Sequence, residues 1–214
     1  MGRLISTFAA SAPTRRLMIF IDGGYLRKGV NKIMRDAKAD KRISYRGLRD
    51  FIVSQVAIEG LRPELIRAYY YDGRADPLEQ REKYMEQEKY FAKIQSKKSY
   101  ELRLGRQIKT KDGDRQKGVD ILLTLDMLSK GFLKHYDIAA FVGGDDDFLD
   151  LISAVKNLAG RRVFGFYFSH NISPRLRDSF DVEIVLDKVK VRNIMVKKKI
   201  LRSKPLTEFS TSRK

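Results

Sequence analysis

The stretch "DIAAFVGGDDDFLDLISAVKNLAG" (residues 137–160) joins a nearly continuous apolar run, two glycines, three consecutive aspartates and an amphipathic segment that stops at a glycine. An apolar run that ends in turn residues is typical of a buried strand, and an acid before helical spacing with a final glycine is typical of a capped helix. A buried strand that leads directly into a helix indicates an α/β sheet. Because Asp145, Asp146 and Asp147 repel one another, their charge requires a partner such as water, a helix end, a basic group or a metal ion.

The same alternation of strand and helix patterns covers most of the chain. Apolar or alternating runs predict strands at residues 15–22, 64–73, 100–107, 137–144, 161–168 and 182–186. Segments with helical spacing lie between them at residues 44–58, 76–95, 119–131 and 147–160. Strands that alternate with helices favour a mostly parallel central sheet of five to six strands, with right-handed crossovers and helices on both faces. The predicted fold class is therefore α/β, in three α/β/α layers.

A single core is expected for 214 residues, flanked by two extensions. Residues 1–15 carry Arg, Ser and Thr without acids, which weakly resembles a transit peptide, and they are interpreted as a short flexible leader. Residues 16–187 form the predicted domain. Residues 188–214 hold ten basic side chains and one acid and are interpreted as a solvated basic tail. No apolar run reaches the roughly 18 residues of a membrane span, so no stable membrane insertion is expected.

The chain carries 44 Lys and Arg against 27 Asp and Glu, a formal net charge of +17. This excess favours a polyanionic partner, above all nucleic acid and less specifically an acidic membrane surface, but it does not distinguish RNA from DNA. Cysteine is absent, which excludes disulfides and thiolate metal sites and fits a reducing, cytoplasmic location. With only His135 and His170 available, a metal would be held by oxygen ligands, which points to Mg²⁺ or Mn²⁺. Whether the chain forms a homodimer stays open.

Carboxylates follow the predicted strands at the edge where ligands bind in open α/β sheets. Asp22 closes the first strand, and Asp145 and Asp147 follow the fourth. Asp120 begins the helix before that fourth strand and is expected to face the same edge. Carboxylates gathered without a cation raise one another's pKa, and a magnesium or manganese ion removes this penalty. A pair of such ions about 3.5–4 Å apart can hold both the attacking and the leaving oxygen of a phosphodiester.

Each of these acids alone also has an ordinary structural explanation. Asp147 can cap the following helix, Asp22 can be a turn residue before two glycines, and Asp120 can lie at a helix N-terminus, where the dipole favours an anion. The convergence of three sites on one edge of the sheet favours a metal site over three separate explanations.

Several other polar residues are weaker candidates. Lys117 lies three residues before Asp120 and is a candidate for binding a substrate phosphate. Asp126 points about 120° away from Asp120 on the predicted helix and is interpreted as a structural or surface acid, with an auxiliary role in the site as the alternative. Asp72 ends a strand in "YYYDGRADP" and is interpreted as an ordinary turn residue, and His170 is interpreted as an exposed loop residue.

Three motifs, "FIDGGY", "KGVDILLTLD" and "FVGGDDDFLDLISAVKNLAGRRVFGF", together resemble the NYN domain, in the LabA-like branch of the PIN-like nuclease superfamily, from about residue 17 to residue 186. The resemblance implies a PIN-like, Rossmann-like fold that binds divalent metal and cleaves RNA. It also implies that Asp22, Asp120, Asp145 and Asp147 are the catalytic and metal-binding acids. Asp146 fills the variable position between the last two and is expected to point elsewhere.

Two positions depart from the family pattern. Tyr25 stands where asparagine is common, and Gly143 stands where serine is common. Tyr25 is a candidate substrate contact that either stacks on a base or replaces the missing polar group with its hydroxyl. The leading expectation is a metal-dependent ribonuclease, with a non-catalytic RNA-binding module as the alternative. A phosphatase of the haloacid dehalogenase type is disfavoured because Gly24 stands where that family needs a second acid.

Overall fold

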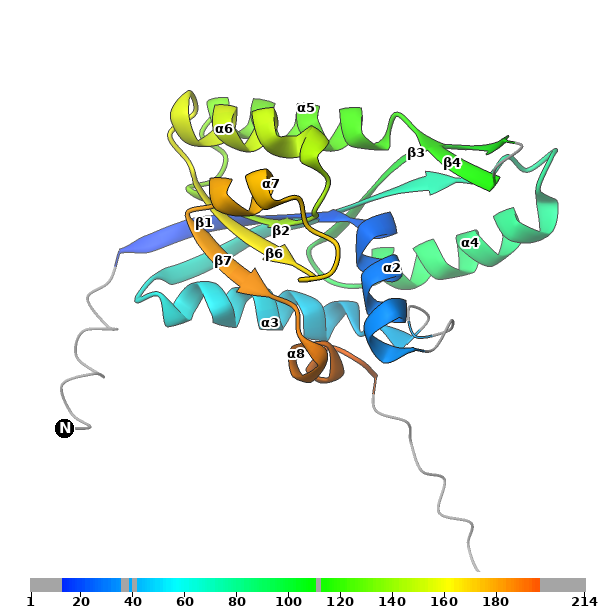
Figure 1. The fold of residues 1–214 in the computed structure, drawn as a ribbon, viewed down its shortest axis with the longest axis horizontal. Coiled ribbons are helices and arrows are strands. Elements are labelled where there is room, and N and C mark those ends of the chain that lie inside the picture. Colours follow the sequence, from blue (N-terminus) through cyan, green and yellow to red (C-terminus); the bar gives the residue numbers. More distant parts are fainter. Residues whose placement is uncertain (1–12, 36–38, 40–41, 111–112, 197–214) are drawn as a thin grey trace, which may run out of the picture.

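The polypeptide folds around a mostly parallel sheet with helices on both faces, which gives three α/β/α layers (Figure 1). The computed structural model describes residues 13–35, 39, 42–110 and 113–196. The sheet has seven strands in the order β4-β3-β2-β1-β5-β6-β7. The strands are β1 (Thr14–Asp22), β2 (Arg62–Arg74), β3 (Tyr100–Thr110), β4 (Gly113–Lys117), β5 (Ile138–Val142), β6 (Arg162–Tyr167) and β7 (Val182–Val185).

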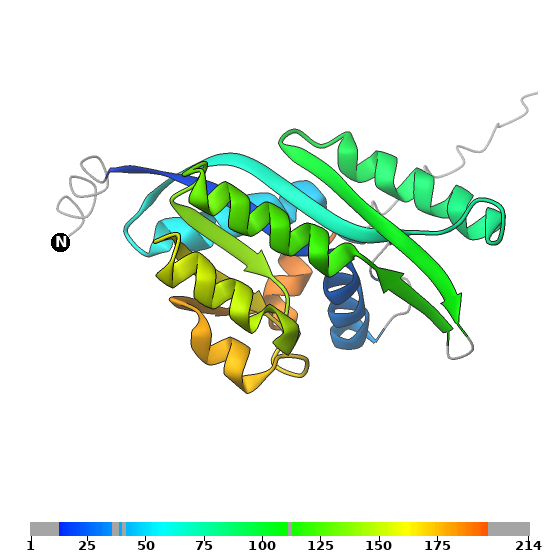
Figure 2. The same ribbon diagram turned by 90° about the horizontal axis from the view of Figure 1, so that it is seen from above.

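The helices alternate with the strands along the chain. They are α2 (Gly23–Met34), α3 (Tyr45–Ile58), α4 (Arg81–Gln95), α5 (Val119–Phe132), α6 (Leu149–Asn157), α7 (Pro174–Ser179) and α8 (Lys188–Asn193), with the short 3-10 helix η2 (Asp146–Phe148) before α6. α2, α3, α4 and α8 cover one face of the sheet, and α5, α6 and α7 cover the other (Figures 1 and 2). No helix in the described ranges combines the length and the apolar character needed to cross a membrane.

Strand β1 lies at the centre because it pairs in parallel with both β2 and β5. Phe20 of β1 is opposite Tyr69 of β2 on one side and Phe141 of β5 on the other. All five residues of β5 are buried, as expected for a parallel strand that is covered on both faces. The chain therefore runs outward from β1 to β4 and then returns to the other side of β1 as β5.

Aromatic side chains fill the core around the central strands. Phe20 stacks on Tyr69 with ring centroids 5.7 Å apart and meets Tyr136 edge-on at 5.5 Å. Phe141 of β5 meets Phe148 of η2 at 5.2 Å, also edge-on. Such ring pairs stabilise a core beyond the area that they bury. The contact with Phe148 also anchors the turn that carries the three consecutive aspartates.

The expected number of five to six strands is wrong, because β4 adds a seventh strand. β4 pairs with β3 in antiparallel register, with Arg106 opposite Lys117. It lies at the edge of the sheet and consists of polar residues and a glycine, so it lacks the apolar pattern that marks the other strands. The α/β class and the mostly parallel sheet are confirmed.

Helix α2 is not predicted by the sequence, because three of its twelve residues are glycines and each weakens a helix by about 1 kcal/mol relative to alanine. Asp22 caps the first turn by accepting a hydrogen bond from the backbone nitrogen of Tyr25 at 2.9 Å. Gly29 lies so close to Phe168 that a Cβ atom there would be 2.1 Å from the ring. Capping and tertiary packing therefore outweigh the low helix propensity.

The predicted basic tail begins with an ordered segment. Helix α8 packs against α2, and Val191 and Ile194 are fully buried. The interpretation as a solvated tail is therefore wrong for residues 188–196, because these two apolar side chains complete the core beneath α2. Residues 197–214 and most of the predicted leader, residues 1–12, lie outside the described residues.

We predict that Phe20→Ala lowers the free energy of unfolding by about 3–5 kcal/mol, because it leaves a cavity at the centre of the sheet. Ile58→Ala is the matched control, since the Ile58 side chain is 72% exposed, and it should change stability by less than about 0.5 kcal/mol. Urea denaturation measures both. Similar losses in the two variants would contradict the central position of β1.

Candidate active site

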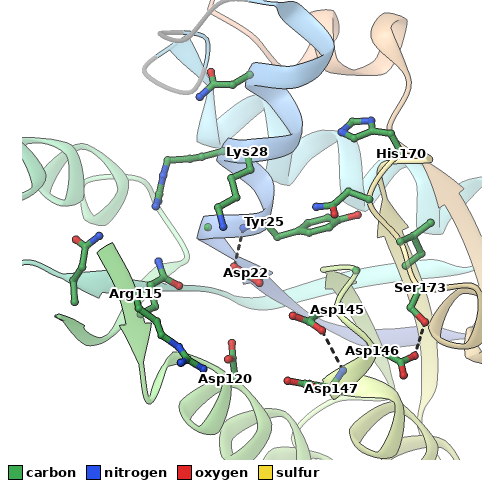
Figure 3. Close-up of a pocket in the computed structure, with 18 residues that line it drawn as sticks. Asp22, Tyr25, Lys28, Arg115, Asp120, Asp145, Asp146, Asp147, His170 and Ser173 are labelled. Atoms are coloured by element: carbon green, nitrogen blue, oxygen red, sulfur yellow. Dashed lines mark hydrogen bonds between the residues drawn. The ribbon is translucent and has the colours of Figure 1, made fainter. Parts of the chain in front are cut away.

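Four predicted acids line one cavity at the carboxyl edge of the sheet. Asp22 is the last residue of β1, Asp145 and Asp147 follow the neighbouring strand β5, and Asp120 is the second residue of α5. They line a cavity of about 1040 Å³, into which Figure 3 shows their carboxylates converging from three elements. The cavity opens between β1 and β5, where the direction of strand addition reverses, and this is where open α/β sheets bind ligands.

Asp22 is the most constrained of these acids. Its Oδ1 accepts the hydrogen bond from the Tyr25 backbone that caps α2. Burial, with smaller contributions from the charges of Asp120 and Asp72, raises the pKa of Asp22 to about 6 against the opposing effect of the Tyr25 hydrogen bond. The capping role suggested for Asp22 by its position is thus compatible with a second role in the cavity.

Asp120, Asp145 and Asp147 form the other side of the cavity. Asp145 caps η2 by accepting a hydrogen bond from the Asp147 backbone at 3.3 Å, and both side chains are largely exposed. Burial raises the pKa of Asp120, and the charges of Asp145 and Asp147 raise it further. In the described ranges, none of the four acids lies within 4.0 Å of a Lys, Arg or His side-chain nitrogen. Their mutual repulsion is therefore not cancelled by an ion pair.

The donor set fits a hard divalent cation, although the acids are not yet gathered around one point. Within the described part of the chain, no group of three or more acidic or histidine side chains is close enough to hold a metal ion as it stands. Asp145 and Asp147 are exposed, and exposed side chains change rotamer within nanoseconds. Carboxylate oxygens are the ligands that Mg²⁺ and Mn²⁺ prefer. The acids therefore have the ligand chemistry of a magnesium or manganese site, although the described side chains do not form one as they stand.

Asp146, between the two site aspartates, is tied to the loop before α7. Its carboxylate accepts a hydrogen bond from the Ser173 hydroxyl and another from Arg175 Nη1 at 3.2 Å. Figure 3 shows it turned toward Ser173, away from the side where Asp145 lies. The carboxylate of the middle aspartate is thus bound by the loop before α7 and by α7, although Asp146 also lines the cavity.

Tyr25 joins the ends of β5 and β6 beside the cavity. Its hydroxyl accepts a hydrogen bond from the Phe168 backbone nitrogen at 2.9 Å, its ring lies 5.4 Å from the Phe168 ring, and only 7% of the residue is exposed. A Cβ atom at Gly144 would lie 2.5 Å from the Tyr25 ring, which explains why glycine is required there. These contacts favour a packing role for Tyr25 over base stacking.

The second departure from the family pattern also has a packing reason. A Cβ atom on Gly143 would lie 2.4 Å from the ring of Phe141. The serine that is common at this position in the family therefore does not fit beside Phe141 in its present rotamer. Gly143 therefore leaves the space that the Phe141 ring occupies.

Comparison with known proteins identifies the family. Residues 16–187 match the NYN domain. The chain belongs to the NYN domain family. NYN domains are PIN-like nucleases, a family that usually uses divalent metals.

Two solved structures are also similar to this NYN domain. One, a protein of unknown function from Vibrio parahaemolyticus RIMD 2210633, is 19% identical with a TM-score of 0.59, and the match covers 85% of this chain and 96% of that one. At this identity the likeness shows the fold alone. The other, from a study of the mechanism and regulation of Sir2 enzymes, is 12% identical with a TM-score of 0.37 over 90% of this chain and 94% of that one, and carries no argument. Comparison with curated proteins gives no match.

Basic side chains also line the NYN cavity. They are Arg27 and Lys28 of α2 and Arg115 of β4. Lys117, the predicted phosphate contact, is exposed at the end of β4 and does not line this cavity. Arg115 was missed by the sequence reasoning because β4 itself was not predicted. His170 lines the cavity from an exposed loop, and partial burial together with the charge of Lys32 lowers its pKa.

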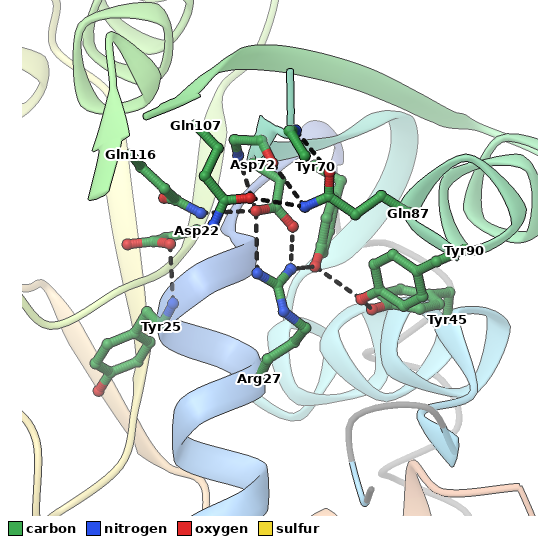
Figure 4. Close-up of polar contacts among 12 residues, drawn as sticks. Asp22, Tyr25, Arg27, Tyr45, Tyr70, Asp72, Gln87, Tyr90, Gln107 and Gln116 are labelled. Atoms are coloured by element: carbon green, nitrogen blue, oxygen red, sulfur yellow. Dashed lines mark hydrogen bonds and ion pairs between the residues drawn. The ribbon is translucent and has the colours of Figure 1, made fainter. Parts of the chain in front are cut away.

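Asp72 is the clearest correction to the site residues. It lies inside β2, which continues to Arg74 in register with β3, so the interpretation as a turn residue is wrong. Asp72 is 1% exposed and forms a two-pronged ion pair with Arg27, in which Nη2 and Oδ1 are 3.0 Å apart (Figure 4). It also accepts a hydrogen bond from Gln116 Nε2 at 2.7 Å. The sequence around Asp72 carries no local signal for these distant partners.

A chain of hydroxyl groups extends this ion pair into the core. Arg27 donates to the Tyr70 hydroxyl at 2.8 Å, and the Tyr70 and Tyr90 hydroxyls are 2.9 Å apart. Tyr90 is in turn hydrogen-bonded to Tyr45 (Figure 4). Asp126, interpreted as structural from the sequence, is confirmed in that role by its ion pairs with Arg103, Lys130 and a hydrogen bond from Tyr71.

We predict that Asp72→Ala lowers the free energy of unfolding by about 3–5 kcal/mol, because it leaves the largely buried Arg27 charge without a partner. The double variant Arg27→Met/Asp72→Leu removes both charges and should be more stable than Asp72→Ala. Chemical denaturation measures the two against the wild type. A double variant as unstable as the single variant would show that the unpaired Arg27 charge is not the cause of the loss.

We predict that the metal-free protein loses stability as the pH rises from about 4 to about 6, and that Asp22→Asn removes this loss. The folded-state pKa of Asp22 is about 6, above its ordinary value of 3.8, so the folded state binds the proton more tightly in this window. Deprotonation above it therefore opposes folding, by at most about 3 kcal/mol.

Asp22→Asn is a suitable probe because asparagine caps a helix as well as aspartate does. Denaturation in EDTA at a series of pH values gives the stability of each protein. The difference between variant and wild type should grow in favour of the variant from pH 4 to pH 6. A constant difference would contradict the raised pKa.

Proposed function

We propose that this NYN domain is a metal-dependent ribonuclease of the LabA-like branch, which hydrolyses RNA phosphodiester bonds at the acidic cavity. The observation that carries the proposal is the convergence of four carboxylates without an ion-pair partner in the described ranges, at the switch point of an NYN fold. The branch assignment rests on the three sequence motifs that surround Asp22, Asp120 and Asp145.

The four acids have different roles in the proposed metal site. Asp22, Asp120, Asp145 and Asp147 would hold Mg²⁺ or Mn²⁺, and an ion bound there supplies Lewis-acid stabilisation of the charge that develops on the phosphate. Asp22 is held in place by its capping bond, so it is the fixed member of the set. Asp145 and Asp147 are exposed and can adjust to the ion and the substrate.

The basic side chains of the cavity and the net charge favour nucleic acid as the substrate class, and the resemblance to NYN domains points to RNA. Lys28 and Arg115 line the same cavity as the acids and can contact phosphate oxygens beside the reacting bond. Arg27 is less available, because Asp72 already matches its charge. The formal net charge of +17 adds attraction to the RNA backbone that does not depend on sequence and that weakens with salt.

One observation favours the alternative of a non-catalytic RNA-binding module. In the described residues, the acids are not close enough together to hold a metal ion without side-chain rotation. Binding of RNA that is unchanged by Asp22→Asn, without cleavage, is the result that this alternative requires.

We predict that the purified protein cleaves labelled single-stranded RNA with Mg²⁺ or Mn²⁺ and not with EDTA. Asp145→Asn should lower the rate by more than the roughly 10–100-fold that loss of a residue supporting a metal ligand costs. Asp150→Asn is the matched control, because Asp150 is an exposed acid in the first turn of α6, and it should cleave at the wild-type rate.

The assay separates the catalytic claim from contamination. Cleavage that persists in Asp145→Asn at the same purity would point to a contaminating nuclease. Absence of metal-dependent cleavage by the wild type would contradict the catalytic proposal.

A further inference from the structure

A second cavity continues from the acidic one. It has a volume of about 440 Å³ and lies between α2 and α4, where Asp72 of β2 and Gln107 of β3 also line it. Arg27 and Gln107 line both cavities, so the two are neighbours that share a wall. A ligand too long for the acidic cavity can therefore extend into the second one across these two side chains.

The second cavity has the opposite charge character. Helix α4 contributes three lysines to its lining, Lys83, Lys89 and Lys93. The lining acids are Glu86 and Asp72, and the charge of Asp72 is matched by Arg27. The acidic cavity, in contrast, is lined by five aspartates. A polyanion bound at the acidic cavity can therefore extend onto the more basic lining of the second cavity.

The floor of the second cavity is aromatic. Phe91 is 2% exposed, and Tyr90 is held by its hydroxyl contacts with Tyr70 and Tyr45. A basic groove over an aromatic floor suits a single nucleic-acid strand, because lysines contact the phosphates while the ribose or base lies against apolar surface. Lys89 and Lys93 are four residues apart on the helix, so they lie on the same side of α4 and can reach neighbouring phosphates.

The groove is formed in advance of any ligand. Gln87 of α4 donates to the Gly73 carbonyl at 3.1 Å and to Gln107 Oε1 at 3.0 Å, and it accepts a hydrogen bond from the Ala75 backbone at 2.7 Å. These bonds fix α4 to β2 and β3. The ion pair with Asp72 similarly fixes the Arg27 side chain in the shared wall. Binding there does not require ordering of these groups.

We propose that the second cavity binds the single-stranded RNA segment that extends from the phosphodiester at the acidic cavity, with Lys89 and Lys93 contacting its phosphates. This proposal rests on the proposed function for its substrate class. It assigns a second role to α4, since the helix then fixes the path of the strand as well as covering the sheet. It also predicts that affinity grows with RNA length in a way that depends on these two lysines.

Binding of labelled single-stranded RNA tests the proposal, with EDTA present so that the RNA is not cleaved. Oligonucleotides of about 4 and about 12 nucleotides cover the range of single-strand binding sites. The variant is Lys89→Gln/Lys93→Gln. The matched control is Arg15→Gln/Arg62→Gln, which removes two exposed charges at the amino ends of β1 and β2, on the opposite edge of the sheet. Circular dichroism and thermal melting verify that both variants fold.

The expected result is a weaker salt dependence for Lys89→Gln/Lys93→Gln on the longer RNA. Each lost phosphate contact lowers the slope of log K against log salt by about 0.7, so two contacts lower it by about 1.4. Between about 50 and 200 mM salt, the wild type should then lose about 7-fold more affinity than the variant. The ratio of affinities for long and short RNA should also fall in the variant but not in the control.

The outcomes distinguish this proposal from the proposed function. The assignment of the groove would be overturned if the lysine variant and the arginine control had the same slope of log K against log salt and the same ratio of affinities for long and short RNA. This holds even if the wild type cleaves RNA. RNA binding by the wild type without metal-dependent cleavage would overturn the ribonuclease activity alone, and the same comparison of slopes would still decide the groove. A wild type that neither binds RNA in EDTA nor cleaves it with Mg²⁺ or Mn²⁺ would overturn both.

Discussion

The parallel pairing of β1 with β5 is the interaction on which the candidate site depends. Ile21 of β1 lies opposite Val142 of β5. Asp22 directly follows Ile21, and two glycines followed by Asp145 come directly after Val142. Because parallel strands end at the same edge, this register brings the two acidic turns together whatever their charge. Burial of the two apolar strands stabilises the fold, while the gathered carboxylates oppose it. A cation bound at that edge would reduce the repulsion between the carboxylates without any change in the sheet.

The contrast among the acids of this protein separates structural from functional roles. Asp126 and Asp137 each contact basic side chains, and these contacts hold their pKa values below the ordinary range. Asp22 and Asp120 have no such partner among the described residues, and their pKa values are raised. Acids that are kept together without neutralisation are typical of functional sites. Asp72 belongs to the paired class, and its ion pair with Arg27 holds the wall between the two cavities.

The sequence predicts the parts of this molecule that depend on local patterns. Apolar or alternating runs mark six of the seven strands, and the topology rules for parallel sheets suffice to bring Asp22, Asp120 and Asp145 to one cavity. The parts it misses depend on distant contacts. Helix α2 exists because Gly29 fits against Phe168, and the role of Asp72 requires Arg27, which is 45 positions away in the chain.

The missed basic residues have a related cause. Arg115 lines the cavity from β4, a polar strand at the edge of the sheet. β4 is defined by its pairing with β3 and has no apolar pattern, so the sequence does not predict this strand. Helix α8 likewise forms within a highly charged segment, because Val191 and Ile194 find a place in the core. In each case a tertiary contact, rather than the local composition, decides the structure. Sequence reasoning is therefore stronger for the acids at strand ends than for the basic groups around them.

The central claim is that the four acids hold a divalent metal ion, and a crystal soaked in manganese tests it most directly. The account predicts anomalous density among Asp22, Asp120, Asp145 and Asp147, with the side chains of Asp145 and Asp147 rotated toward the ion. It also predicts that Asp146 keeps its contact with Ser173. A fully soaked crystal with no density at this edge of the sheet, or with manganese bound elsewhere alone, would contradict it.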